Sequence, residues 1–311
     1  MNLFQKTIAQ AVSFQGTGLH SGKEVHVRLL PAGADSGIRF RRTDLHPAVE
    51  IPALAECVGD TARSTSVRDA ATGASVGTIE HLMAAFAATG ICNITVECDG
   101  EEFPILDGCS EQLLGYLRQA GIQKQRNIRP RLVLSEPIRY RHENGAELTA
   151  EPSDHFSLEV TVDYHTEVLG RQTAVLHSLE EAEKEAAGCR TFCFLHEIWP
   201  LIQHNLARGG SLDNAIVYVA KPLQPEEQQK IAEFFHVEGI QVSESGILSN
   251  NRLHFENEAA RHKLLDLLGD LQLVGCDLQA RITAYCPGHA ANTRMAQEIF
   301  RWMQQHPESL R

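Results

Sequence analysis

The order of predicted elements along the chain constrains its fold more than any single motif does. Strands come first: residues 24–30 alternate apolar and polar side chains, the period of a half-buried strand. A helix over 78–90, a strand over 93–98 and a helix over 111–120 follow, and both helices end at a glycine. The same order of strands, helix, strand, glycine-containing turn and helix returns in the second half. We therefore predict an α+β fold built from a duplicated unit.

Between the two halves lies a polar stretch without periodicity, from Gln123 to Pro130. We predict the domain boundary there, with a first domain over residues 1–124 and a second over 131–311. An insert around 194–219 is expected in the second domain, as a helix over 194–207 and a strand over 215–219. The other elements expected there are strands over 131–134, 138–140, 147–150, 157–163 and 279–285, and helices over 258–273 and 292–304.

Composition excludes several classes of protein. The 311 residues are 43% hydrophobic and 22% charged, which is typical of globular domains. A formal net charge of -12 lacks the basic footprint of a nucleic-acid-binding protein. No apolar run approaches the roughly 18 residues of a membrane span, and residues 1–12 lack the apolar core of a signal peptide. We expect no nucleic-acid partner, no stable membrane insertion, and a cytoplasmic location, where the eight cysteines would stay reduced.

The predicted helix over 258–273 carries a polar stripe opposite its leucines. His262, Asp266 and Asp270 lie within about 80° of one another around the helix axis. One interpretation is a solvated face with ordinary charge pairs one turn apart. The other is that His262 and Asp266 bind one metal ion, since imidazole nitrogen and carboxylate oxygen are both zinc ligands.

Three further fragments are weak when taken singly. Glu80-His81 lies on a predicted helix, where one residue can bind a metal ion while the other reaches a water bound to that ion. The two residues can equally occupy surface or core positions without a functional role. His289 follows Gly288 in a turn; it is either an exposed loop residue or a histidine oriented by Asp270. Thr191 and Phe192 can offer a hydroxyl and an aromatic face, or simply end a strand.

Eight short motifs occur together in one order along the chain. They are Gly18-Leu19-His20, Arg41-Arg42-Thr43-Asp44, Thr78-Ile79-Glu80-His81-Leu82, Ile105-Leu106-Asp107-Gly108, Arg190-Thr191-Phe192, Gly209-Gly210-Ser211, Arg261-His262-Lys263 through Asp266 to Gly269-Asp270, and Gly288-His289. With them the chain resembles the bacterial UDP-3-O-acyl-N-acetylglucosamine deacetylases, the zinc amidases of lipid A biosynthesis. The resemblance runs from about Val12 to Trp302.

This resemblance implies a fold of two α+β domains of similar topology, with the helices sandwiched between two sheets. It also implies one zinc ion per chain, with His81, His262 and Asp266 as its ligands. By the same resemblance Glu80 is the general base and His289 the second catalytic histidine. Asp270 stands behind that histidine, and Thr191 binds the carbonyl oxygen of the substrate.

The substrate implied is a UDP-linked N-acetylglucosamine with a 3-O-hydroxyacyl chain, whose N-acetyl group is hydrolysed to a free amine and acetate. Residues 194–219 would line an acyl passage. The expected substrate-binding residues are Lys263, Phe192, Leu19, Ser64, Ser211, Asp163 and Tyr164. We expect a monomer, with no second enzyme fused behind Arg311.

The segment Ala62-Arg63-Ser64-Thr65 departs from the family, whose better-known members carry more apolar or sulfur-containing residues there. We expect Arg63 to alter the acyl-chain entrance. Two alternatives to the deacetylase remain. One is a zinc amidohydrolase of the same fold acting on another acylated sugar. The other is a non-catalytic nucleotide-sugar-binding descendant, which would be expected to lose Glu80 or a metal ligand, yet all are present.

Overall fold

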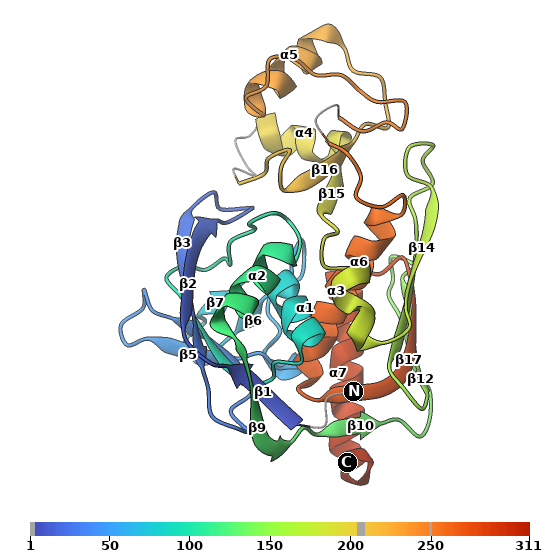
Figure 1. Cartoon of the computed structure of the whole chain (residues 1–311). Coiled ribbons are helices and arrows are strands. Elements are labelled where there is room, and N and C mark those ends of the chain that lie inside the picture. Colours follow the sequence, from blue (N-terminus) through green and yellow to red (C-terminus); the bar gives the residue numbers. More distant parts are fainter. Residues whose placement is uncertain (1–3, 204–208, 249–250) are drawn as a thin grey trace.

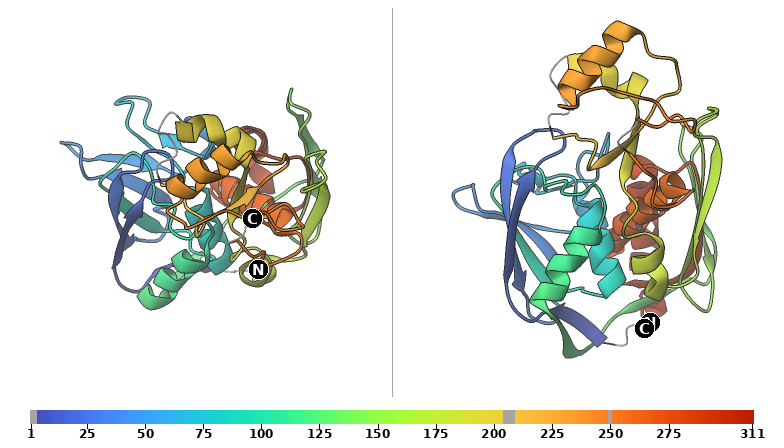
Figure 2. Two further views of the ribbon diagram at one scale, coloured as in Figure 1. Left: turned by 90° about the horizontal axis from the view of Figure 1, so that it is seen from above. Right: turned by 45° about the horizontal axis from the view of Figure 1, so that its top comes forward.

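Two β-sheets enclose a layer of helices in this computed structural model, which describes residues 4–203, 209–248 and 251–311. In Figure 1 the sheet with β2 and β3 lies on one side, the sheet with β12, β14 and β17 lies on the other, and α1, α2, α6 and α7 fill the space between them. The right-hand view of Figure 2 shows the same sandwich. The predicted arrangement of helices between two sheets is confirmed.

The first sheet has the strand order β2-β3-β8-β4-β5. Its strands are β2 (Val12–Thr17), β3 (Glu24–Pro31), β4 (Ile38–Arg42), β5 (Val49–Pro52) and β8 (Ile94–Cys98). The central strand β8 runs parallel to β4, and the other neighbours are antiparallel. Helix α1 (Glu80–Thr89) precedes β8, and α2 (Glu111–Ala120) follows it.

The second sheet repeats this arrangement in the order β11-β12-β17-β13-β14, with β10 (Arg131–Val133) also paired to β17. Its strands are β11 (Ile138–Arg141), β12 (Glu147–Pro152), β13 (Ser157–Asp163), β14 (Arg171–Leu176) and β17 (Asp277–Tyr285). Again the central strand is the last in sequence; β17 is parallel to β13 and to the short strand β10, and antiparallel to β12. Helices α6 (Glu258–Leu271) and α7 (His289–Gln305) flank β17 along the chain as α1 and α2 flank β8. The predicted duplication is thus present in the topology.

Sheet faces and helices share one core. In β3 the residues Val25, Val27 and Leu29 are buried while the residues between them are exposed, as the alternation predicts. Helices α1 and α6 pack against each other so closely that a side chain at Gly269 would collide with the backbone carbonyl of Glu80. A glycine is therefore required where the two helices approach, and this contact joins the two halves of the chain.

The polar stretch at 123–130 is not irregular. It forms most of β9 (Ile122–Ile128), which pairs antiparallel with β1 (Phe4–Ile8). The strand is exposed along almost its whole length, so neither face carries the apolar alternation by which a strand is predicted. This strand was therefore not predicted from the sequence, and the position of the domain boundary stays a prediction.

A lobe projects from one end of the sandwich, between β14 and α6 in sequence (Figure 1). It contains β15 (Thr191–Phe194), α4 (Leu195–Gln203), β16 (Ala215–Tyr218) and α5 (Pro225–Phe234), and β15 runs parallel to β16. The helix predicted over 194–207 corresponds to α4, and residues 204–207 of that prediction lie outside the described residues. Helix α5, which the sequence did not predict, enlarges the lobe beyond residue 219.

The remaining elements are short. They are β6 (Val67–Arg68), β7 (Ser75–Val76), α3 (Ala182–Glu185) and the 3-10 turns Ala55–Cys57, Leu179–Glu181, Gln272–Val274 and Pro307–Ser309. Within the described parts of the chain, no helix is both long and apolar enough to cross a membrane.

Candidate active site

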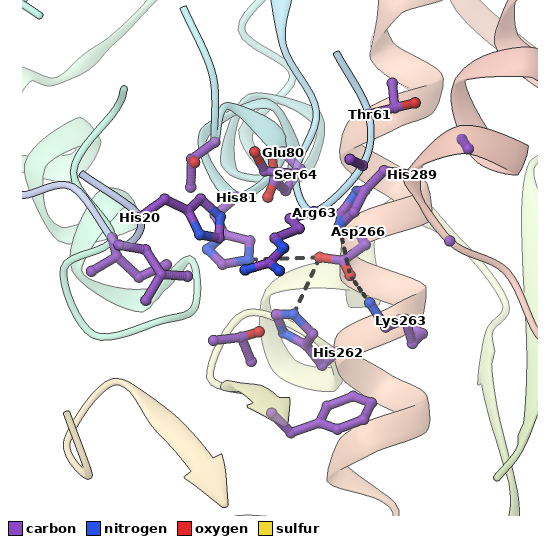
Figure 3. A pocket seen from close by; sticks show the side chains of 18 of the residues that line it. His20, Thr61, Arg63, Ser64, Glu80, His81, His262, Lys263, Asp266 and His289 are labelled. Atoms are coloured by element: carbon purple, nitrogen blue, oxygen red, sulfur yellow. Dashed lines mark hydrogen bonds and ion pairs between the residues drawn. The ribbon is translucent and has the colours of Figure 1, made fainter. Parts of the chain in front are cut away.

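The contact between α1 and α6 brings together side chains from the two halves of the chain. His81 lies in the first turn of α1, and His262 and Asp266 lie one turn apart on α6. One potential ligand atom from each of the three lies within 4.8 Å of the others, and all three residues are buried. Figure 3 shows the three side chains converging on one point.

Asp266 is the centre of this group. Its Oδ1 lies 3.6 Å from His81 Nε2 and 3.3 Å from His262 Nε2, yet it accepts no hydrogen bond although it is buried. A buried carboxylate oxygen without a partner is costly, so it calls for a cation or a donor. Two imidazole nitrogens beside it make a metal ion the fitting partner, because two histidines and one carboxylate form a known catalytic zinc ligand set.

His262 is prepared as a ligand by its surroundings. Its Nδ1 lies 3.0 Å from the backbone carbonyl oxygen of Cys189, the kind of contact that fixes ring orientation in metal sites. Burial lowers the pKa of His262 to about 3, in spite of the nearby Asp266 carboxylate. The ring is therefore neutral at pH 7, and its Nε2 lone pair faces Asp266 and His81.

The other oxygen of Asp266 is paired. Lys263 Nζ lies 2.8 Å from Oδ2, and the lysine side chain is mostly buried. Burial disfavours charge on both groups, but their attraction prevails: the pKa of Asp266 is held well below its usual range and the pKa of Lys263 is raised. The site thus keeps one carboxylate ionised beside a permanent cation.

Glu80 precedes His81 in α1 and points into the same cavity (Figure 3). Its Oε2 accepts a hydrogen bond of 2.9 Å from the backbone N–H of Thr65. Burial raises the pKa of Glu80, and the charges of His289 and His81 oppose that shift. A carboxylate whose pKa is raised is suited to accept and return a proton.

His289 is the first residue of α7, and its ring is directed into the cavity. Its Nδ1 lies 3.3 Å from Asp270 Oδ2, and its Nε2 lies 3.8 Å from Asp266 Oδ2. Burial disfavours the imidazolium, but the carboxylates of Glu80, Asp266 and Asp270 outweigh it and raise the pKa of His289 to about 9. In the metal-free site this histidine is a cation at pH 7.

A cavity of about 330 Å³ opens over this group. Of the residues expected to bind substrate, Leu19, Ser64, Thr191, Phe192 and Lys263 line it. The Phe192 ring stands edge-on to His262 at 6.1 Å between centroids. An aromatic ring, a buried ammonium and four histidines therefore border a single opening.

Three expected substrate residues do not line this cavity. Tyr164 lies behind Phe192, with 5.5 Å between the ring centroids, and the Asp163 carboxylate lies 3.1 Å from His165 Nδ1. Ser211 belongs to a segment that touches the rim, since the Gly209 N–H donates to the Leu19 carbonyl. Contacts of these three residues with substrate stay predictions.

The described residues of the segment 194–219, which was predicted to line an acyl passage, lie in the lobe. Within that segment, Leu195, Trp199 and Val219 line a second cavity of about 200 Å³, together with Ile231 from α5. Apolar residues therefore do border a hollow here, and part of its wall comes from the helix that the sequence did not predict. Its use by an acyl chain stays a prediction.

Two of the interpretations that gave the site residues no functional role are wrong. The polar stripe of α6 is not solvated, because Asp266 is 1% and Asp270 is 0% exposed in the layer between the sheets. His289 is not an exposed loop residue either, since its side chain is 11% exposed. Both errors arise because the sequence of one segment does not show which other segments cover it in the fold.

Arg63, which was expected from the sequence at the acyl-chain entrance, lines the cavity, and so does His20 of the motif Gly18-Leu19-His20 (Figure 3). Other residues around the site were not singled out by sequence reasoning. The Glu102 carboxylate accepts the backbone N–H groups of His20 and Ser21. Asn292 donates to Asp270 Oδ2 at 2.9 Å. These residue types are common and follow no spacing rule, so only the fold reveals their position.

Comparisons with known proteins give the family of the chain. The family model described as UDP-3-O-acyl N-acetylglycosamine deacetylase matches residues 5–236 and 236–301. The chain is 40% identical over 297 residues to the UDP-3-O-acyl-N-acetylglucosamine deacetylase of Anaeromyxobacter sp., covering 95% of this chain and 88% of that protein. It is 37% identical to the enzyme of that name from Myxococcus xanthus, covering 95% and 86%.

The chain is also similar to larger proteins. It is 38% identical over 308 residues to the bifunctional enzyme LpxC/FabZ of Porphyromonas gingivalis, covering 97% of this chain but 65% of that enzyme. For the bifunctional enzyme of Chlorobaculum tepidum the identity is 39%, and the chain spans 64% of its length. Since the family model covers nearly the whole chain and the monofunctional relatives align over most of theirs, the protein belongs to the UDP-3-O-acyl-N-acetylglucosamine deacetylase family.

Proposed function

We propose that this protein hydrolyses the N-acetyl group of a UDP-3-O-(3-hydroxyacyl)-N-acetylglucosamine, releasing acetate and a free amine, as a step of lipid A biosynthesis. The observation that carries the proposal is the convergence of His81, His262 and Asp266 beside Glu80 and His289 in one cavity. Family membership supports the choice of substrate, since the relatives are named for it. A non-catalytic relative would not need a base and an acid at the same cavity.

We propose zinc as the cofactor, one ion per chain, held by His81, His262 and Asp266. When bound there, zinc would polarise the amide carbonyl and lower the pKa of an attacking water towards about 7. Glu80 would accept the proton of that water as its oxygen attacks the carbonyl carbon.

His289 and Thr191 would stabilise the negative charge that develops on the carbonyl oxygen. The imidazolium of His289 has its Nε2 towards the site, and Thr191 lines the same cavity. Preorganised donors at a developing oxyanion usually give a large part of the rate enhancement. The C–N bond then breaks, the nitrogen takes a proton from Glu80 or His289, and acetate leaves with the water oxygen.

Lys263 and Phe192 would hold the nucleotide-sugar. The ammonium of Lys263 borders the cavity although it is paired with Asp266, so it can attract an anionic phosphate group. Phe192 can stack against a sugar ring beside it. We also propose that the enzyme works in the cytoplasm, where its eight free cysteines would stay reduced.

Acetate release from the zinc-loaded protein tests this function. The expected result is stoichiometric acetate and free amine from the acylated UDP-sugar, and loss of activity after chelation with recovery on adding zinc. A His262→Ala variant is the matched control for the metal site. No acetate from the wild-type protein under zinc-replete conditions would contradict the proposal, and faster turnover of another acylated sugar would favour the broader amidohydrolase.

A further inference from the structure

Among the residues that the structure describes, Thr65 is the one whose hydrogen bonds reach both the proposed base, Glu80, and the proposed acid, His289. It is 1% exposed and lies in the loop before β6, in the first half of the chain. From the sequence, Thr65 was given no role of its own and was named only as the last residue of the segment Ala62-Arg63-Ser64-Thr65. Its contacts nevertheless span α1, α6 and α7.

The backbone of Thr65 is fixed to the beginning of α1. Its N–H donates to Glu80 Oε2 at 2.9 Å, and its carbonyl oxygen accepts the N–H of Ile79 at 3.2 Å. The first contact leaves the other oxygen of Glu80, Oε1, as the one free to take a proton. The second holds the loop at the residue that precedes Glu80.

The side chain of Thr65 reaches across to the second half of the chain. Its hydroxyl donates to Asp270 Oδ1 at 2.5 Å, and its oxygen lies 3.2 Å from His289 Nδ1. Asp270 Oδ2 lies 3.3 Å from the same nitrogen. Since the single hydroxyl proton goes to the carboxylate, the hydroxyl oxygen is left to accept from the Nδ1–H of His289.

We propose that Thr65 is a positioning residue that holds Glu80 and His289 in register across the two halves of the active site. With Nδ1–H directed to Thr65 and Asp270, His289 keeps Nε2 pointed at the cavity. The same residue orients the Glu80 carboxylate through its backbone. Thr65 therefore acts through two groups and does not itself touch the reacting atoms. This role rests on the proposed deacetylase function.

Replacing the hydroxyl while keeping the shape tests the side chain. Thr65→Val should lower kcat by about 10- to 100-fold, the usual effect of removing an outer partner of a site residue, with KM and zinc content within about 2-fold of wild type. Thr65→Ser restores the hydroxyl and should restore most of kcat. Thr89→Val is the matched control, because within the described parts of the chain the Thr89 hydroxyl bonds only to carbonyls of α1, and it should leave kcat unchanged.

A double variant distinguishes a positioning role of Thr65 from a general destabilisation of the structure. If Thr65 acts through Asp270 and His289, then Thr65→Val combined with Asp270→Asn should lose little more activity than the more severe single variant. Multiplying losses would mean that the two residues act independently and would overturn the proposal. If Thr65→Val does not fold or loses zinc, Thr65→Ser must still exceed Thr65→Ala in kcat by about 10-fold; equal values would overturn the proposal.

A spectroscopic measurement distinguishes this proposal from the function on which it rests. In zinc-loaded protein labelled with ¹⁵N-histidine, the Nδ1–H resonance of His289 should shift in Thr65→Val and return in Thr65→Ser. Wild-type protein that releases no acetate but shows these shifts would refute the function and leave the positioning intact. Active wild-type protein with an unchanged resonance and unchanged kcat in Thr65→Val would refute the positioning alone.

Discussion

Replacing Gly269 by alanine should disturb the metal site without touching any of its ligands. The added Cβ would lie 2.1 Å from the backbone oxygen of Glu80 and 3.1 Å from the backbone nitrogen of Ala84. Comfortable contacts need about 3.5 Å, so α1 and α6 must separate by about 1 Å. That movement draws His81 away from His262 and Asp266. Zinc ligands tolerate only about 0.2 Å of such displacement.

The expected losses follow from this separation. Overpacking of this kind costs about 1–3 kcal/mol of unfolding free energy, and a displacement of about 1 Å at the site lowers turnover by about 100-fold. Gly115→Ala in α2 is the matched control, because a Cβ there meets nothing within 4 Å. Both variants gain the same helix propensity, about 1 kcal/mol, so their difference isolates the collision.

Denaturant unfolding of the metal-free proteins and competition with a zinc chelator measure the two effects. Gly269→Ala should be less stable than Gly115→Ala and should bind zinc at least about 10-fold more weakly. Equal unfolding free energies and equal zinc affinities in the two variants would show that the helix contact does not set the ligand geometry.

Three further predictions concern the proposed chemistry. Glu80→Ala should keep its zinc and lose about 10²- to 10⁴-fold in turnover; loss of zinc together with activity would make Glu80 a ligand instead. In the metal-free protein, NMR should find His289 titrating near pH 9, above its unfolded value of about 6.5. Its contribution to stability is then complete below about pH 6.5 and disappears as the pH rises through about 9; a midpoint below 6.5 would contradict this. A substrate without the 3-O-acyl chain should react far more slowly, because each buried CH₂ contributes about 0.8 kcal/mol, and equal kcat/KM would reject an acyl passage.

The sequence alone was sufficient to predict relations between residues of one helix and the order of elements along the chain. His262 and Asp266 could be paired because they stand one turn apart on α6. The duplication could be predicted because each half repeats one order of elements, and the two sheets do share one strand order. That His81 meets these residues was implied only by the family resemblance, since no spacing rule connects residues in different halves of the chain.

What the sequence did not reveal depends on contacts made after folding. Strand β9 escaped prediction because it is exposed on both faces and is defined by its pairing with β1. Thr65 and Asn292 are ordinary polar residues until Asp270 is buried between them. The solvated interpretation of the α6 stripe failed for the same reason, because the helix is covered by neighbours that its own sequence does not specify.

The most direct test of the proposed metal centre is a crystal structure of the zinc-loaded protein with anomalous diffraction data at the zinc edge. We expect one strong anomalous peak at about 2.0–2.2 Å from a nitrogen of His81, a nitrogen of His262 and a carboxylate oxygen of Asp266, with Glu80 beside it and not bound to it. A peak at any other group of residues, or no peak in crystals of protein whose activity depends on zinc, would contradict this account.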